Sequence, residues 1–205
     1  MTGLFSGARQ ISISDCTYLK EVFHGFNKDS WAYFFPFLFA YSLPPRRPVY
    51  ILVENGATII FQYLRRPKMD RIDLLMPPLP LNTSSFKWLS SLTREVRSEK
   101  AQKEIRILWV DDSDKKLLSG YFKDHICFEV RDKEYIYSPF DVWQAKGSKF
   151  RDFRKKVHRV SNMSPIFRKM TPRDVGDANS LLREWRRVQG RRNAFLLDWG
   201  YTCSI

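Results

Sequence analysis

The sequence contains few cysteines, histidines and glycines, and each shortage excludes a class of site. Three cysteines and three histidines are spread over 205 residues, without a CxxC motif or a Cys/His pair at metal-ligand spacing. This pattern argues against a disulfide scaffold and against a zinc site. We therefore expect no metal site, and a reduced, cytoplasmic compartment.

Glycine-rich phosphate-binding motifs are absent as well. The chain contains no G-x-x-x-x-G-K-[ST], no G-x-G-x-x-G and no G-x-S-x-G. Nucleotide-binding folds and hydrolases that depend on these motifs are therefore excluded. No cofactor is evident from the sequence.

No apolar run is long enough to span a membrane. The most apolar segment, residues 31–43, has thirteen residues and contains Pro36, whereas a spanning helix needs about 20 apolar residues. The N-terminus also lacks the basic-then-apolar pattern of a signal peptide. We expect a core or interfacial position for 31–43 and no transmembrane segment.

Apolar and basic residues, by contrast, are plentiful. Apolar residues make up 43% of the chain and aromatic residues 15%, which is enough to build a core and excludes disorder. The net charge is +13, and residues 141–205, with 15 basic and 6 acidic side chains, carry most of it. The length allows one large or two small domains.

The hydrophobic pattern predicts two helical segments followed by a β-hairpin. Asp15 is a suitable N-cap for a helix that ends near Gly25, and the next apolar segment is expected to be helical up to Pro36. Asn55 and Gly56 then separate two β-branched and aromatic runs within 48–64, which is typical of a two-residue hairpin turn.

Helices and strands alternate after the hairpin. In order, we predict a strand at 71–76, a helix from 82–84 to 101, a strand at 105–110, a helix at 114–122, short strands near 126–130 and 134–137, a basic helix at 148–161, a strand at 165–170, and a helix from Thr171 to about 189. The predicted fold class is α/β, with an α+β mixed sheet: a β-hairpin meander flanked by helices.

Asp111 and Asp112 lie just before the helix predicted at 114–122, and Asp114 is its first residue. Three closely spaced acids allow two interpretations, a Mg²⁺ site or the acidic N-terminus of a helix. Because no further carboxylates follow at matched spacing, the helix N-terminus explains them better.

The basic helix is the first candidate binding site. Residues 146–159 contain seven basic side chains and a single acid, Asp152. Such a block favours a polyanionic partner, a tRNA, a nucleotide or an anionic lipid headgroup, although a solvated helix face would look the same. The candidate phosphate- or nucleic-acid-binding residues are Lys149, Arg151, Arg154, Lys155 and Arg159.

The stretch 131–159, RDKEYIYSPFDVWQAKGSKFRDFRKKVHR, resembles the family of the phosphatidylglycerol lysyltransferase C-terminal domain. The order of the aromatic segment, the hairpin, the strand ending in Pro-Pro-Leu-Pro and the helix with Trp185 fits as well. The resemblance implies a tandem acyltransferase-like fold, similar to the N-acetyltransferases, of which this chain holds the N-terminal half to two-thirds.

The resemblance also implies a function. We expect an acyl- or aminoacyl-transferase-like protein that moves an aminoacyl group from tRNA to a lipid or amine acceptor, with aminoacyl-tRNA or acyl-CoA as donor. Tyr135 and Tyr137 are weak candidates for assisting the transfer, and packing of both on the sheet is the alternative. The other hypothesis is a non-catalytic module that binds nucleic acid or anionic surfaces through 148–161.

The resemblance also gives expected domain limits. The strand at 71–76 is followed by Pro-Pro-Leu-Pro and not by a glycine-rich loop that could bind a pyrophosphate. The second half of the family's fold is expected to be missing. We therefore expect an incomplete catalyst, which either needs that second half or forms an oligomer. The expected parts are a flexible N-terminus at 1–10, the first half at 11–145, a basic helix, strand and Trp-containing helix at 146–190, and a tail at 191–205.

Overall fold

The computed structural model describes residues 3–43, 47–64, 70–98, 103–129 and 137–192. Its contacts divide the chain into two compact units, one up to Glu129 and the other from Val130. Residues 139–144 fall within the limits expected for the first half, 11–145, but they form a helix of the second unit.

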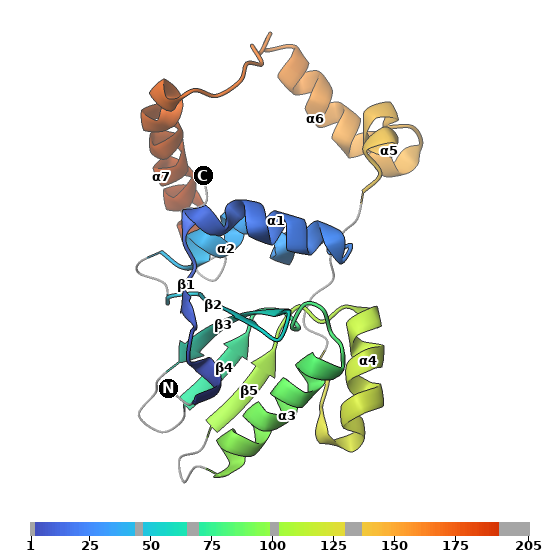
Figure 1. The fold of residues 1–205 in the computed structure, drawn as a ribbon. Helices are drawn as coiled ribbons and strands as arrows, with labels where there is room; N and C mark the ends of the chain where they lie inside the picture. Colours follow the sequence, from blue (N-terminus) through green and yellow to red (C-terminus); the bar gives the residue numbers. More distant parts are fainter. Residues whose placement is uncertain (1–2, 44–46, 65–69, 99–102, 130–136, 193–205) are drawn as a thin grey trace. The chain divides into compact units, whose positions relative to one another are not determined.

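The first unit contains a five-stranded mixed sheet (Figure 1). Its strands, in both chain order and sheet order, are β1 (Arg9–Gln10), β2 (Tyr50–Glu54), β3 (Ala57–Leu64), β4 (Asp70–Leu74) and β5 (Lys103–Ile107). Pairing is antiparallel from β1 to β4, and β4 and β5 are parallel. The predicted mixed sheet with its hairpin meander is confirmed.

The β2–β3 hairpin turns at the predicted dipeptide. Asn55 and Gly56 both have positive φ, 51° and 75°, as a two-residue turn that matches the strand twist requires. The turn fixes a register in which Glu54 pairs with Ala57 and Tyr50 with Phe61. As a result Ile51 and Ile60 lie on one face of the sheet, and Leu52, Ile59 and Phe61 lie on the other.

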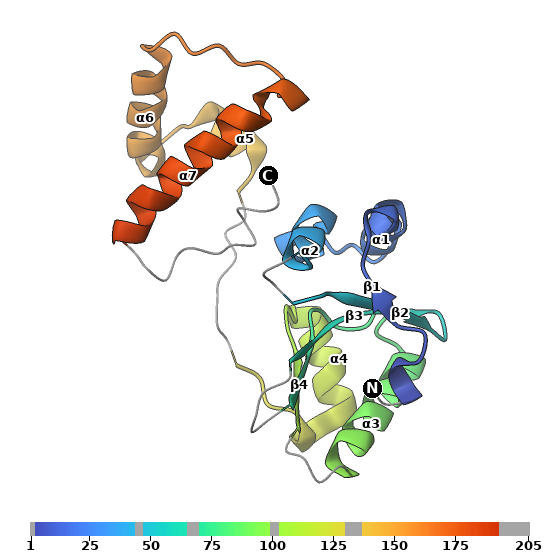
Figure 2. The same ribbon diagram turned by 90° about the vertical axis from the view of Figure 1, so that its left-hand side faces the viewer.

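Helices cover both faces of the sheet (Figure 2). Helices α1 (Cys16–Gly25) and α2 (Phe35–Tyr41) pack on one face through a buried cluster that includes Leu19, Phe23 and Leu38. Helices α3 (Thr83–Ser98) and α4 (Asp112–Phe122) pack on the opposite face through a second cluster around Leu92 and Leu118. The core therefore has two layers, one on each side of the sheet.

The N-terminal segment differs from its predicted flexibility. Residues Gly3–Phe5 form a short 3₁₀ turn, and the Phe5 ring is buried against Phe61 and Trp88, at centroid distances of 4.6 and 5.7 Å. Arg9 and Gln10 then pair with β2 as strand β1. Aromatic burial and strand pairing hold this segment in place.

Pro36 also acts differently from the prediction. We expected a helical segment to reach up to this residue, but α2 begins at Phe35 and runs to Tyr41, with Pro36 in its first turn. Proline fits there because its missing N–H would have no intrahelical acceptor and its fixed φ suits the helix.

The second unit consists of helices in its described part. They are α5 (Pro139–Gln144), a 3₁₀ turn at Ser148–Phe150 that continues into α6 (Arg151–Ser161), and a 3₁₀ turn at Pro172–Asp174 that continues into α7 (Val175–Arg192). Thr171 and Asp174 form a capping box before α7. The predicted basic and Trp-containing helices are therefore present.

The strand predicted at 165–170 is wrong. Residues 164–171 have no regular structure, and Ile166 and Phe167 are 90% and 87% exposed. A strand needs a neighbour to pair with its N–H and C=O groups, and no described strand pairs with these residues. The strand predicted near 126–130 is absent over 126–129, and the rest of it and most of 134–137 lie outside the described residues.

Candidate functional site

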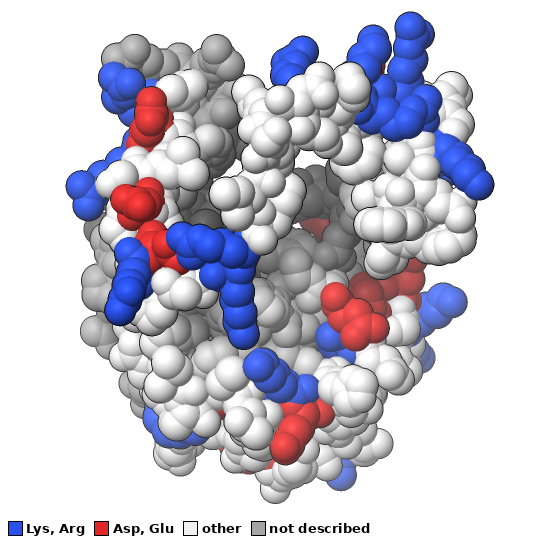
Figure 3. Space-filling model, turned by 90° about the horizontal axis from the view of Figure 1, so that it is seen from above, with Lys and Arg blue, Asp and Glu red and all other residues white. Residues whose placement is uncertain are grey.

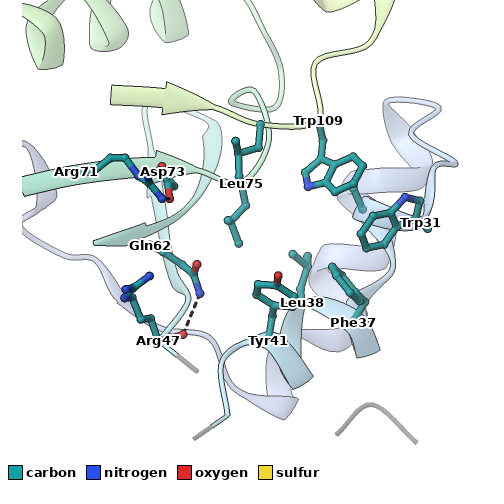
Figure 4. Close-up of a pocket in the computed structure, with 12 residues that line it drawn as sticks. Trp31, Phe37, Leu38, Tyr41, Arg47, Gln62, Arg71, Asp73, Leu75 and Trp109 are labelled. Carbon is teal, nitrogen blue, oxygen red and sulfur yellow. Dashed lines mark hydrogen bonds and ion pairs between the residues drawn. The ribbon is translucent and has the colours of Figure 1, made fainter. Parts of the chain in front are cut away.

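A cavity of about 500 Å³ lies in the first unit, between helix α2 and the ends of strands β4 and β5 (Figure 4). This volume is typical of small-molecule sites. Leu75 directly follows β4, and Leu108 and Trp109 directly follow β5, so the cavity is next to the carboxyl ends of the parallel strand pair. In open sheets with parallel strands, ligands bind at this end.

One wall of the cavity is polar. Arg71 and Asp73 of β4 share a sheet face and contact each other: Arg71 Nη2 donates to Asp73 Oδ2 at 2.9 Å. Arg71 Nε and Asp73 Oδ1 are 2.8 Å apart, but this second contact lacks hydrogen-bond geometry and leaves two buried polar atoms without a hydrogen bond. Gln62, opposite Asp73 on β3, donates to the carbonyl of Arg47 at 2.9 Å.

The polar wall belongs to a charged sheet face. On the same face of β5, Glu104 pairs in register with Arg71 and Arg106 with Asp73, and Arg106 Nε donates to Glu104 at 2.8 Å. This hydrogen bond lowers the pKa of Glu104 below its usual value. The part of this face near β2 is instead apolar and covered by α1 and α2. The sheet face therefore changes from core to polar surface at the cavity.

The opposite wall of the cavity is aromatic. Trp31, in the turn before α2, makes edge-to-face contacts with Phe37 and with Trp109, both at 4.3 Å between ring centroids. Tyr41 lies at the end of the same wall, 5.0 Å from Phe37. Figure 4 shows these rings on one side of the cavity, with Arg47, Gln62 and the Arg71–Asp73 pair on the other.

Trp109 has an unusual backbone conformation. Its φ is +51°, in the left-handed region, which costs a bulky L-residue roughly 1–2 kcal/mol. Its side chain is 37% exposed and lines the cavity. Strain of this kind is typical of functional sites, because only the surrounding structure keeps it in place.

A buried ionic cluster holds the backbone after Trp109. Lys28 donates to Asp111 at 2.6 Å and to Asp114 at 2.7 Å, and Asp111 also caps α4 by accepting from the N–H of Asp114. Burial opposes the charge on Lys28, but the two hydrogen bonds outweigh it and raise its pKa. Of the two interpretations of these acids, the helix N-terminus is the one present.

The two carboxylates of this cluster shift in opposite directions. Burial opposes ionisation of Asp111, but hydrogen bonds from Lys28, Ser113 and the Asp114 N–H lower its pKa to about 2. Burial dominates at Asp114 and raises the pKa of its carboxyl. Burial also raises the pKa of the neighbouring Tyr33 above its usual range.

The predicted basic site lies in the second unit, and its members differ in their contacts. Arg154 Nη1 donates to the carbonyls of Ala145 and Gly147, at 2.5 and 2.9 Å, and so closes the turn before α6. Lys149 lies over the Phe150 ring at 5.0 Å, and Lys155 is 3.9 Å from Asp152. No ion-pair partner of Arg151 or Arg159 is found among the described residues.

The other basic side chains of α6 are exposed to solvent. In Figure 3, Lys and Arg side chains gather in one corner of the view with few acidic side chains among them. The structure thus keeps Lys149, Arg151, Lys155 and Arg159 on the surface of the second unit, while the guanidinium of Arg154 is occupied by backbone carbonyls. A binding role for these residues stays a prediction.

The structure describes one of the two candidate tyrosines. Tyr137 is 66% exposed and immediately precedes Ser138, the N-cap of α5. Tyr135 lies outside the residues that the structure describes. Their catalytic role stays a prediction.

The segment between β4 and α3 is rich in proline, and some of its N–H groups are already bonded. Pro77, Pro78 and Pro80 have none, and the N–H of Leu79 donates to the Thr58 carbonyl at 3.0 Å. The N–H of Ser85, in the first turn of α3, is taken by Asn82 Oδ1.

Sequence reasoning missed the cavity residues. Arg71 and Asp73 alternate with Ile72 and Leu74, and this alternation was interpreted only as a strand. The signal that could have indicated the site is the pair of charged residues on one face of a strand whose other face is buried. Nothing in the sequence indicates the left-handed backbone of Trp109.

Comparisons with known proteins bear on the fold. No protein-family model matches the chain, and no curated protein matches it. The fold is similar to a crystal structure of a conserved protein of unknown function from Bacteroides thetaiotaomicron VPI-5482, with a TM-score of 0.66 and 17% identity over 96% of this chain.

The matched region is 64% of that protein, so this chain spans less than two thirds of its length. At this identity the likeness shows the fold alone. Among the described residues, no helix is long and apolar enough to cross a membrane. Together these findings establish a mixed α/β fold for the chain.

Proposed function

We propose that this chain is an acyl- or aminoacyl-transferase-like protein whose first unit binds a substrate in the aromatic cavity. The observation that carries the proposal is the position of the cavity next to the carboxyl ends of β4 and β5, where open sheets bind ligands. The strained Trp109 in its wall and the family resemblance of the sequence support it.

In such a transfer, an amine nitrogen or hydroxyl oxygen of the acceptor bonds to the acyl carbon. The bond from that carbon to the donor's ester oxygen or thioester sulfur breaks, and the leaving group takes up the proton. Because Pro77, Pro78 and Pro80 replace the glycine-rich loop that a pyrophosphate would need at the junction between β4 and α3, we take aminoacyl-tRNA rather than acyl-CoA as the donor for this unit.

A transfer assay tests the proposal. The purified chain is incubated with aminoacyl-tRNA or acyl-CoA, each labelled in the acyl group, and a panel of amine and hydroxyl acceptors. We expect labelled product with the wild type, less with the Arg71→Met/Asp73→Leu variant, and wild-type amounts with Arg97→Gln, an exposed arginine on α3. Failure of both donors to give product would refute the enzymatic role.

Binding of nucleic acid or anionic surfaces through α6 is the second candidate function. The specific observation in its favour is the set of exposed basic side chains on this helix, of which Arg151, Lys156 and Arg159 have no ion-pair partner among the described residues. Phosphate contacts make affinity fall with salt, by a log–log slope of about 0.7–0.9 per contact.

This second role is measured by the anisotropy of a labelled tRNA over a range of salt concentrations. Reversing Lys156 and Arg159 to Glu should weaken binding similarly for every sequence and reduce the slope by about 2. The matched control is Arg183→Glu on α7, also exposed. Affinity that does not depend on salt would contradict the hypothesis.

A further inference from the structure

The cavity has a polar end and an aromatic end, and this division restricts the ligands that fit it. In Figure 4 the Arg47 side chain, Gln62 and the Arg71–Asp73 pair lie opposite the rings of Trp31, Phe37 and Trp109. A ligand that fills both ends has a planar or apolar part at one side and a polar group at the other.

The charges at the polar end favour an anion. Among the residues that the structure describes, the charged side chains that line the cavity are Arg47, Arg71 and Asp73, and their charges sum to one positive charge. Asp73 already accepts from Arg71, whereas the Arg47 side chain has no ion-pair partner among the described residues. The Arg71 guanidinium has more N–H donors than it gives to Asp73, so it can also donate to a ligand. Two parallel N–H groups of a guanidinium match the two oxygens of a carboxylate.

The single excess charge also limits the charge of the ligand. A carboxylate carries one negative charge, whereas a phosphate monoester carries between about 1.5 and 2 at neutral pH. A monoanion would therefore match the net charge of this wall, whereas a phosphate monoester would exceed it. The rings at the far side offer faces and edges to a planar group.

We infer that the cavity binds a small monoanionic carboxylate that carries an aromatic ring, with its carboxylate at Arg47 and Arg71 and its ring among Trp31, Phe37 and Trp109. This inference rests on the proposed function in that it takes the cavity to be the substrate site. It deepens that function by naming the chemical class of the acceptor, which carries its amine or hydroxyl in addition to the carboxylate and the ring.

The inference is tested by isothermal titration calorimetry of the full chain with a matched set of probes. The reference probe is 3-phenylpropanoate, whose neutral amide and whose amine counterpart, 2-phenylethylammonium, test the charge. Hexanoate tests the ring, and phenyl phosphate tests the preference for one negative charge. We expect the reference probe to bind at least tenfold more tightly than each of the other four.

Two variants assign the binding to this cavity. Arg47→Gln should lower the affinity for 3-phenylpropanoate at least tenfold, because a charge-assisted hydrogen bond to the carboxylate is lost. It should leave the affinity for the neutral amide unchanged. Arg97→Gln, on the opposite side of the sheet, should leave both affinities unchanged. Circular dichroism and the urea midpoint show that Arg47→Gln, at an exposed position, is folded.

Several outcomes would overturn the inference: no binding of 3-phenylpropanoate, equal or tighter binding of any other probe, or unchanged affinity in Arg47→Gln. The transfer assay is independent of these measurements. Transfer without binding of the reference probe rejects only the ligand class, and binding without transfer rejects only the enzymatic role.

Discussion

Replacing Lys28 by Met tests how the backbone next to the cavity is held. The Lys28 side chain is 9% exposed and its partner Asp114 5% exposed, while Asp111 is 47% exposed. Without the ammonium, the Asp114 carboxylate stays buried beside a second carboxylate. Breaking a buried pair in this way costs roughly 3–5 kcal/mol, and because Asp111 is hydrated we expect about 3 kcal/mol.

Urea unfolding followed by circular dichroism measures this loss. The matched control is Lys20→Met on helix α1, where the side chain is exposed, and it should change the unfolding free energy by less than about 0.5 kcal/mol. Adding Asp114→Asn to Lys28→Met should recover part of the loss, with a coupling energy of about 1–3 kcal/mol in the double-mutant cycle.

The same substitution should reach the cavity. The Lys28 cluster fixes Asp111, two residues after the left-handed Trp109, so its loss lets this backbone relax to an ordinary conformation. We expect Lys28→Met to lower the affinity for 3-phenylpropanoate as well as the stability of the fold. A Lys28→Met variant that is as stable as Lys20→Met would refute the reasoning about the buried cluster.

Three further predictions concern other features of the chain. Trp109→Gly should be about 1 kcal/mol more stable than Trp109→Ala in urea, because only glycine removes the left-handed strain; equal stabilities would show that no strain is present. A hydrogen bond from Arg9 lowers the pKa of Asp15 to about 2, so the stability it provides is present above pH 4 and is lost as the pH falls toward 2; Asp15→Asn should lack this part of the acid sensitivity in pH-dependent unfolding. Arg154→Met should speed hydrogen exchange in the turn before α6, because it removes two hydrogen bonds to carbonyls, whereas Lys155→Met should not.

The first unit was predictable from the sequence where local chemistry determined the structure. Asn55 and Gly56 are among the few residues that accept positive φ at both turn positions, and the runs around them have the period of strands. Asp111 satisfies orphan N–H groups at the start of α4, as an N-cap aspartate is expected to do. In both cases the signal and its cause lie within a few residues of each other.

The errors arose where distant residues decided the outcome. Phe5 is ordered because Phe61 and Trp88 receive its ring, and a sequence pattern does not contain that contact. The segment 165–170 has the composition of a strand, but a strand exists only if another strand pairs with it. Pro36 was ambiguous for a different reason: proline both ends helices and begins them, and only its position in the turn distinguishes the two.

The cavity illustrates why a binding site is harder to predict than a fold. Replacing a buried ion pair by apolar residues of similar volume is often neutral or stabilising, and a left-handed Trp costs stability outright. Neither the Arg71–Asp73 pair nor Trp109 is therefore explained by the needs of the fold. The sheet face is mostly apolar where α1 and α2 cover it, and it is charged at the cavity and on the neighbouring strand β5, at Glu104 and Arg106. Residues that weaken the fold at the carboxyl ends of two parallel strands are accounted for if they bind a ligand there.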